Sequence, residues 1–179
     1  MWAQRPRRNI ARVMFLERTT RRQLMFDGLL AAAILALGLL PTIDLRSAPE
    51  FSREADALHF VLVVLLSAPL VLRRVYTVPV FIVILASWVI DRGLDYPGTA
   101  AEFGVGVAFY TIGAELDRRR SLQIGGAASG VVVLWTAIGA LVLESVVAIA
   151  VVSSVISTAT PLLLGREMHE RRRRVDELR

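Results

Sequence analysis

The chain has 179 residues, 55% of them hydrophobic, and its mean hydropathy is +0.56. A soluble domain of this length cannot bury so much apolar surface in one core, so the composition predicts a multi-pass membrane protein. The net charge of +5 comes from arginines that gather beside apolar runs, where they act as topology signals, and we therefore expect no nucleic-acid partner. The absence of cysteine excludes disulfides, thiolate metal sites and cysteine nucleophiles.

The N-terminal segment, residues 1–23, is strongly basic, and the first apolar run, 24–40, follows it. Such an excess of arginine beside a first span keeps the segment in the cytoplasm, and no small-residue cleavage pattern follows, so we expect a retained first span. Asp27 lies in the first turn of this span, where Arg21 or Arg22 can neutralise it. A carboxylate so close to the interface is predicted to be an anchor and not a proton relay.

Six apolar runs are predicted to be membrane-spanning helices: 24–40, 57–72, 75–90, 99–114, 122–143 and 146–164. Several are shorter than the roughly 20 residues that cross a bilayer unaided, and snorkelling arginines can make up the difference. Counting arginines in the short loops places both termini in the cytoplasm. We therefore expect an all-α polytopic protein of the inner (plasma) membrane, with a six-span input domain over 24–164.

The C-terminal segment, 165–179, is predicted to be a cytoplasmic signalling helix. Glu167 and Glu170 each precede an arginine by four residues, the spacing that supports a helix. Four apolar residues follow the a/d spacing of a coiled coil: Leu164, Met168, Val175 and Leu178. Arg171 occupies the position between Met168 and Val175 and breaks this apolar seam. The segment is either the start of an output coiled coil or a charged helix end that anchors the last span to headgroups.

Small residues mark the last two spans. Gly126 and Gly130 have the small-xxx-small spacing at which two helix backbones can approach closely, and Ala150, Ser154 and Thr158 recur at four-residue steps. These five residues are predicted to be helix-packing positions.

Pro161 lies between the last span and the charged tail. It is predicted to be a hinge, the alternative being a tolerated kink in a membrane helix.

A polar cluster at the outer mouth is predicted from Asp56, His59, Glu102 and Glu144, which all sit at helix ends on the outer side. It could respond to pH, although a histidine at headgroup level is the simpler interpretation. One histidine with scattered carboxylates does not make a metal signature, so we expect no metal. The chain contains no glycine-framed serine and no phosphate-binding loop, so we expect no catalytic residue and no cofactor.

Three segments carry a resemblance to a known family: SAPLVLRRVYTVPVF (67–81), AFYTIGAELDRRRSL (108–122) and LGREMHERRRRVDELR (164–179). Together with the basic N-terminus, they resemble the N-terminal membrane region of actinobacterial sensor histidine kinases, in the two-component class similar to nitrate and membrane-fluidity sensors. The resemblance covers about residues 20–179. It implies the input part of a homodimer that precedes a coiled coil, a phospho-accepting helix and an ATP-binding domain.

Nothing in the chain corresponds to those kinase domains, so it is either a fragment of such a kinase or a stand-alone descendant of its input module. His169, in REMHE, superficially resembles the family's phospho-acceptor motif, but it falls directly at the membrane exit, where that family usually shows only arginines. We therefore expect no phospho-acceptor in this chain.

The expected function is that of a sensor input module, which passes a stimulus in or near the membrane through the last span to the output helix. The stimulus would be lipid state, a membrane-active compound or an apolar ligand held between helices. The expected partners are membrane lipids, a second copy of the chain, and kinase domains or a response regulator through a parent protein. The rivals are a small transporter or channel subunit, which needs a continuous polar path, and a scaffold that recruits a partner through its basic ends.

Overall fold

The computed structural model describes residues 21–43, 54–142 and 147–177. Within these ranges every regular element is a helix and no strand occurs, which confirms the all-α prediction. The elements are α2 (Arg21–Ile43), α3 (Ala57–Ser67), η2 (Ala68–Leu72), α4 (Thr77–Gly93), η3 (Ala100–Glu102), α5 (Phe103–Glu115), α6 (Arg118–Val142) and α7 (Val147–Glu177).

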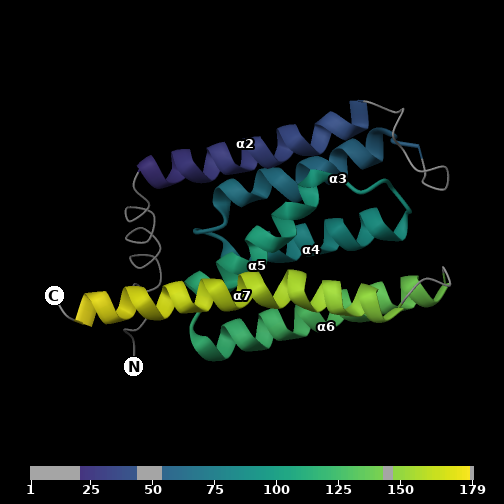
Figure 1. Ribbon diagram of the computed structural model, residues 1–179. Helices are drawn as coiled ribbons and strands as arrows, with labels where there is room; N and C mark the ends of the chain where they lie inside the picture. The colour runs from purple at the N-terminus through teal and green to yellow at the C-terminus, as the bar shows by residue number, and fades with distance from the viewer. Residues whose placement is uncertain (1–20, 44–53, 143–146, 178–179) are drawn as a thin grey trace, which may run out of the picture.

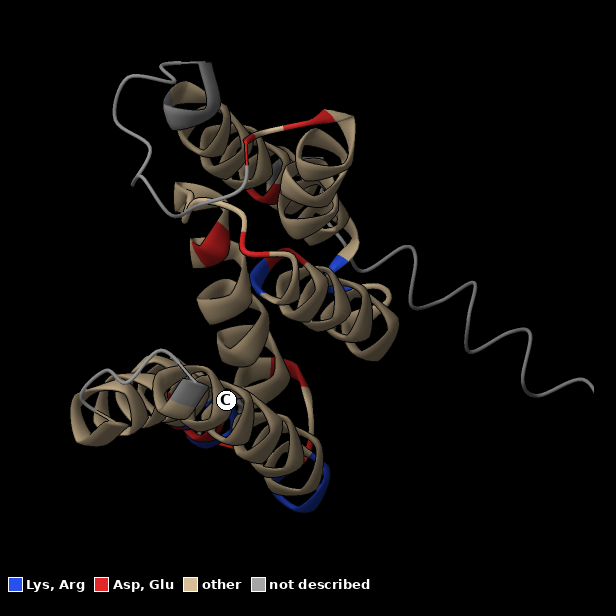
Figure 2. Ribbon diagram, turned by 90° about the vertical axis from the view of Figure 1, so that its right-hand side faces the viewer, with Lys and Arg blue, Asp and Glu red and all other residues tan. Residues whose placement is uncertain are grey.

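Consecutive helices run in opposite directions, so the start of α2 and the end of α7 lie at the same end of the molecule (Figure 1). Seen along the helix axes, α2, α3 and α4 form one group, while α6 and α7 form a second (Figure 2). α5 lies between the two groups and contacts α4 on one side and α7 on the other. The short helix α5 therefore makes most of the contact between the two groups, and α4 adds a smaller contact with α6.

Three helices are long and apolar enough to cross a membrane: Gln23–Leu40, Arg118–Leu141 and Val147–Val175. The outward-facing side chains of these helices are largely apolar, as expected where a helix faces lipid; Leu29, Leu134 and Ile149, for example, are all exposed. The protein is therefore a helical membrane protein by the length and composition of these helices.

The other predicted spans form shorter helices. The apolar helix over Ala57–Leu72 matches the predicted bounds of the second run, but it falls short of membrane length. Its α-helical part ends at Ser67 because Pro69 has no N–H to donate, and the chain continues as η2. α5 has only 13 residues. Six runs in the sequence thus correspond to three membrane-length helices and a set of shorter ones.

Three glycines bring helix backbones into direct contact. A Cβ added to Gly113 would lie 2.3 Å from the carbonyl oxygen of Leu162, and one added to Gly165 would lie 2.2 Å from that of Tyr110. At the other end of α5, a Cβ on Gly104 would lie 2.2 Å from the Leu66 oxygen. No side chain fits at these positions, so α5 packs backbone to backbone against α7 and against α3.

Candidate functional site

A group of charged residues joins four elements at the end of the molecule where α2 begins and α7 ends. We call it the arginine cluster: Asp27, Arg73, Arg74, Glu115 and Arg172. Asp27 comes from the first turns of α2, the two adjacent arginines from the turn between η2 and α4, Glu115 from the end of α5, and Arg172 from α7.

Asp27 is the buried centre of the cluster, since only 1% of its side chain is exposed. Its Oδ1 accepts hydrogen bonds from Arg73 Nη2 at 2.6 Å and Nε at 3.1 Å, while its Oδ2 accepts one from Arg74 Nε at 2.6 Å. Charge-assisted bonds of this length are the strong ones in proteins. Two guanidinium groups thus compensate one buried carboxylate, and they tie the start of α2 to the η2–α4 turn.

Arg74 extends the cluster toward α7. Its Nη1 lies 3.6 Å from Glu115 Oε1, and the same oxygen lies 4.0 Å from Arg172 Nη1. Burial disfavours the charge on Arg74, but the hydrogen bond and charge of Asp27, together with the charge of Glu115, outweigh it and raise the pKa of Arg74. Arg74 is therefore a permanent cation that links two carboxylates from different helices.

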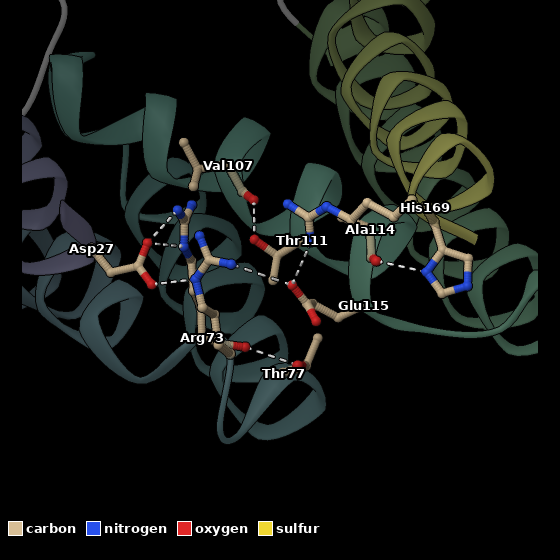
Figure 3. Close-up of polar contacts among 10 residues, drawn as sticks. Asp27, Arg73, Thr77, Val107, Thr111, Ala114, Glu115 and His169 are labelled. Atoms are coloured by element: carbon tan, nitrogen blue, oxygen red, sulfur yellow. Dashed lines mark hydrogen bonds and ion pairs between the residues drawn. The ribbon is translucent and has the colours of Figure 1, made fainter. Parts of the chain in front are cut away.

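His169 adds a second contact between α5 and α7. Its Nδ1 lies 2.8 Å from the carbonyl oxygen of Ala114, and Figure 3 shows the ring pointing toward that carbonyl. A carbonyl can only accept, so Nδ1 carries the proton. Ala114 is in the last turn of α5, where carbonyls lack a partner within the helix, and His169 supplies one. The histidine is therefore engaged in holding α7 against α5.

The sequence predicted Asp27 as an anchor but not its partners. Arg21 and Arg22 lie outside the residues whose side chains the structure describes, and the partners of the carboxylate are Arg73 and Arg74, 46 and 47 positions along the chain. Only the antiparallel packing of α2 against the following hairpin brings these groups together. The sequence predicts the double arginine in the turn to be a topology signal, and no neighbouring residue indicates its second role as the partner of Asp27.

A second polar group lies at the opposite end, and we call it the histidine cluster: Asp56, His59, Asp91 and Tyr96. The side chains of His59 and Asp91 are both buried, with Nδ1 3.1 Å from Oδ1. Asp56 Oδ1 accepts from the His59 backbone N–H at 3.0 Å and from the Tyr96 hydroxyl at 2.6 Å. The cluster thus joins the start of α3 to the end of α4 and to the turn that follows it.

The structure brings together part of the predicted outer cluster. Asp56 and His59 do meet, while Glu102 belongs to an adjacent pair: its carboxylate accepts hydrogen bonds from Arg92 and from the Thr99 backbone N–H. Glu144 lies outside the described residues. Asp91 and Tyr96 were missed because they follow a different apolar run. Among the described residues, no group of three or more His, Asp or Glu side chains is placed to hold a metal ion.

The predicted helix-packing residues fall into two sets. Ser154 and Thr158 are buried on α7. Gly126 and Gly130 face open space, with no described atom within 4 Å of an added Cβ, so they make no close helix contact within the chain. The small-xxx-small spacing indicates which residues permit a close approach, but not which helix face another helix covers. Ala150 is half-buried beside Ser154.

α7 passes through Pro161 as one continuous helix. The role of Pro161 as a hinge therefore stays a prediction, because a continuous helix is compatible with a hinge and with a tolerated proline alike.

Residues 15–172 match the family model described as a domain of unknown function, DUF7134. The chain belongs to this family. The matched range includes both clusters, so the arginine and histidine clusters are parts of the DUF7134 domain. Neither a curated protein nor a solved structure matches the chain.

Proposed function

We propose that this chain is a membrane-embedded sensor input module, which transmits a stimulus through α7 to a cytoplasmic output helix of a two-component sensor histidine kinase. One observation carries the proposal: α7 runs unbroken from an apolar half to a charged tail, and His169 and Arg172 hold it against the end of α5 just where the tail begins. Contacts at that point can set the position of the part of α7 that follows it.

The two faces of the α7 tail support this role. Gly165, His169 and Arg172 follow one another at three- or four-residue steps and face α5. Another face leaves Met168 and Val175 exposed, at 41% and 50%. Apolar residues exposed at a/d spacing on a charged helix favour a partner helix, and a second copy of the chain supplies one in parallel register.

The topology we propose has six crossings with both termini in the cytoplasm. Its support is the alternating direction of the helices, with the start of α2 and the end of α7 at the same end (Figure 1). The arginines of the turns near Arg73 and Arg118 lie toward that end, as the positive-inside rule requires for a cytoplasmic face. In this arrangement the arginine cluster lies at the inner interface and the histidine cluster at the outer one.

A transporter or channel is less well supported. Ion or proton transport needs an ionisable group along a path through the membrane. The buried ionisable side chains among the described residues are Asp27, His59, Asp91 and Tyr96, and they lie in the two clusters at opposite ends. The buried polar side chains between the clusters are uncharged serines and threonines such as Thr111, within a core of apolar residues such as Phe109.

A chimeric kinase tests the proposal. Residues 1–179 would be joined, in continuous heptad register, to the dimerisation and ATP-binding domains of a soluble histidine kinase and reconstituted in lipid nanodiscs. Glu115→Gln removes the charge that attracts Arg172, so we expect autophosphorylation to change at least threefold. Asp117→Asn is the matched control, because Asp117 is exposed, lies just before α6 and, among the described residues, forms its ion pair with Arg120 in the first turn of α6. Equal autophosphorylation rates for wild type and both variants would refute signal transmission through α7.

A further inference from the structure

A cavity of about 570 Å³ lies between α4, α5, α6 and α7, away from the arginine cluster. Such a volume is within the range of small-molecule sites, roughly 300–1,000 Å³. Trp88, Phe103 and Val132 are among the residues that give it an apolar wall. Hydroxyl side chains form a large part of the remaining wall, and Glu102 contributes a carboxylate.

Three of the lining hydroxyl groups face the cavity as acceptors. Thr136 Oγ1 donates to the Val132 carbonyl at 2.8 Å, Ser154 Oγ to the Ala150 carbonyl at 2.8 Å, and Thr158 Oγ1 to the Ser154 carbonyl at 2.9 Å. A hydroxyl has one proton and two lone pairs, so each of these groups has already used its proton within its own helix. At these three positions only oxygen lone pairs remain for a ligand, whereas no described residue accepts the proton of the Thr99 hydroxyl.

The charge of the wall has one sign. Glu102 is acidic, and none of the residues that line the cavity is basic. Arg92 binds the Glu102 carboxylate, and among the described residues Arg92 and the Thr99 backbone N–H donate to the same oxygen, Oε1. Trp88, which is half-buried, adds an indole ring to the wall, a group that can attract a cation.

We propose that this cavity binds a single-chain amphiphile with a primary ammonium head. The apolar wall takes the chain, and the hydroxyl oxygens and Glu102 accept hydrogen bonds from the three N–H groups of the head. The carboxylate of a fatty acid would meet mainly acceptors, and Glu102 would repel both that carboxylate and a phosphate. The idea that this ligand is the stimulus rests on the proposed function, whereas the idea that it binds in the cavity does not.

The test uses the full chain in phosphatidylcholine nanodiscs, with Trp2→Phe and Trp135→Phe so that Trp88 is the only tryptophan. Dodecylamine, which is protonated at pH 7, is titrated below its micelle concentration while the fluorescence of Trp88 is recorded. We expect a saturable change. Gly106→Leu adds a side chain at a lining position where an added Cβ meets no atom within 4 Å, so we expect it to occupy part of the cavity. It should weaken binding at least tenfold.

Gly139→Leu is the control, because Gly139 is equally open, lies on α6 and does not line the cavity. It should bind dodecylamine as the parent does. Glu102→Gln keeps an acceptor for the Thr99 N–H and removes the charge, and it should weaken binding about fivefold. Dodecanoate should not compete.

A linear, unsaturable response, equal binding by the Gly106→Leu and Gly139→Leu variants, or competition by dodecanoate would overturn the assignment. If dodecylamine binds saturably but leaves the autophosphorylation of the chimera unchanged, the cavity is a binding site and its ligand is not the stimulus. Failure of the site and failure of the proposed function are thus distinguished.

Discussion

Asp27 is the residue whose surroundings most constrain the protein, because it is a buried carboxylate held by two guanidinium groups. Asp27→Asn removes the negative charge and leaves Arg73 and Arg74 facing a neutral amide. Removing one partner of a buried ion pair costs about 3 kcal/mol, so we expect a lower midpoint of thermal unfolding in nanodiscs, followed by tryptophan fluorescence. The double variant with Arg73→Gln should recover part of the loss, since fewer charges remain unpaired.

Asp95→Asn is the control for this prediction. Asp95 is exposed and adopts a left-handed backbone with a φ of 59°, a conformation that asparagine also tolerates. Its unfolding midpoint should match that of the wild type. Equal midpoints for the Asp27 and Asp95 variants would show that the arginine cluster contributes nothing to stability.

At the residue scale, the sequence predicts contacts within a helix better than contacts between helices. Asp56 and His59 are three residues apart, and the capping contact between them follows from local rules. The pairing of Glu167 with Arg171 at 2.7 Å follows from their four-residue spacing. Asp91 reaches His59 only because α3 and α4 pack antiparallel, and no spacing within one apolar run contains that information.

At the scale of the element, the α5–α7 interface depends on two glycines that no motif marked. Gly113→Val places a side chain where an added Cβ would lie 2.3 Å from a backbone oxygen, so the helices must separate. We expect the unfolding midpoint to fall by several degrees, and Gly165→Val to behave alike. Gly139→Val is the control, because it places the same β-branched side chain in open space. Its unfolding midpoint measures only the cost of valine in a helix.

An unfolding midpoint for the Gly113 variant equal to that of the Gly139 variant would contradict the backbone contact. Gly126 and Gly130 present the opposite case: they have the expected spacing but face open space. Spacing identifies candidates for a close approach, and the fold decides which candidates are covered. Their role as helix-packing positions stays a prediction.

The number of times that the whole chain crosses the membrane can be measured by labelling. The absence of native cysteine allows a direct measurement with the single-cysteine variants Glu54→Cys and Asp117→Cys, since both positions are exposed. Six crossings place the two residues on opposite sides of the membrane. We expect a membrane-impermeant maleimide added to intact cells to label Glu54→Cys, and to label Asp117→Cys only after permeabilisation.

Crossing by the three membrane-length helices alone would leave residues 54 and 117 on the same side, and both would then be labelled or protected together. The sequence contains six apolar runs because hydropathy counts apolar residues without regard to where a helix begins or ends. The structure divides them by length, because Pro69 ends α3 early and because η3 precedes a short α5. Hydropathy does not report either break.

The position of α5 has a mechanical consequence. Its backbone touches α3 at Gly104 and α7 at Gly113, and no side chain intervenes at either place. A side chain can absorb a small displacement by changing rotamer, whereas two touching backbones cannot. A displacement of α7 toward α5 therefore reaches the α5 backbone directly, and at Gly104 α5 can pass it to α3, with no side chain between them to absorb it.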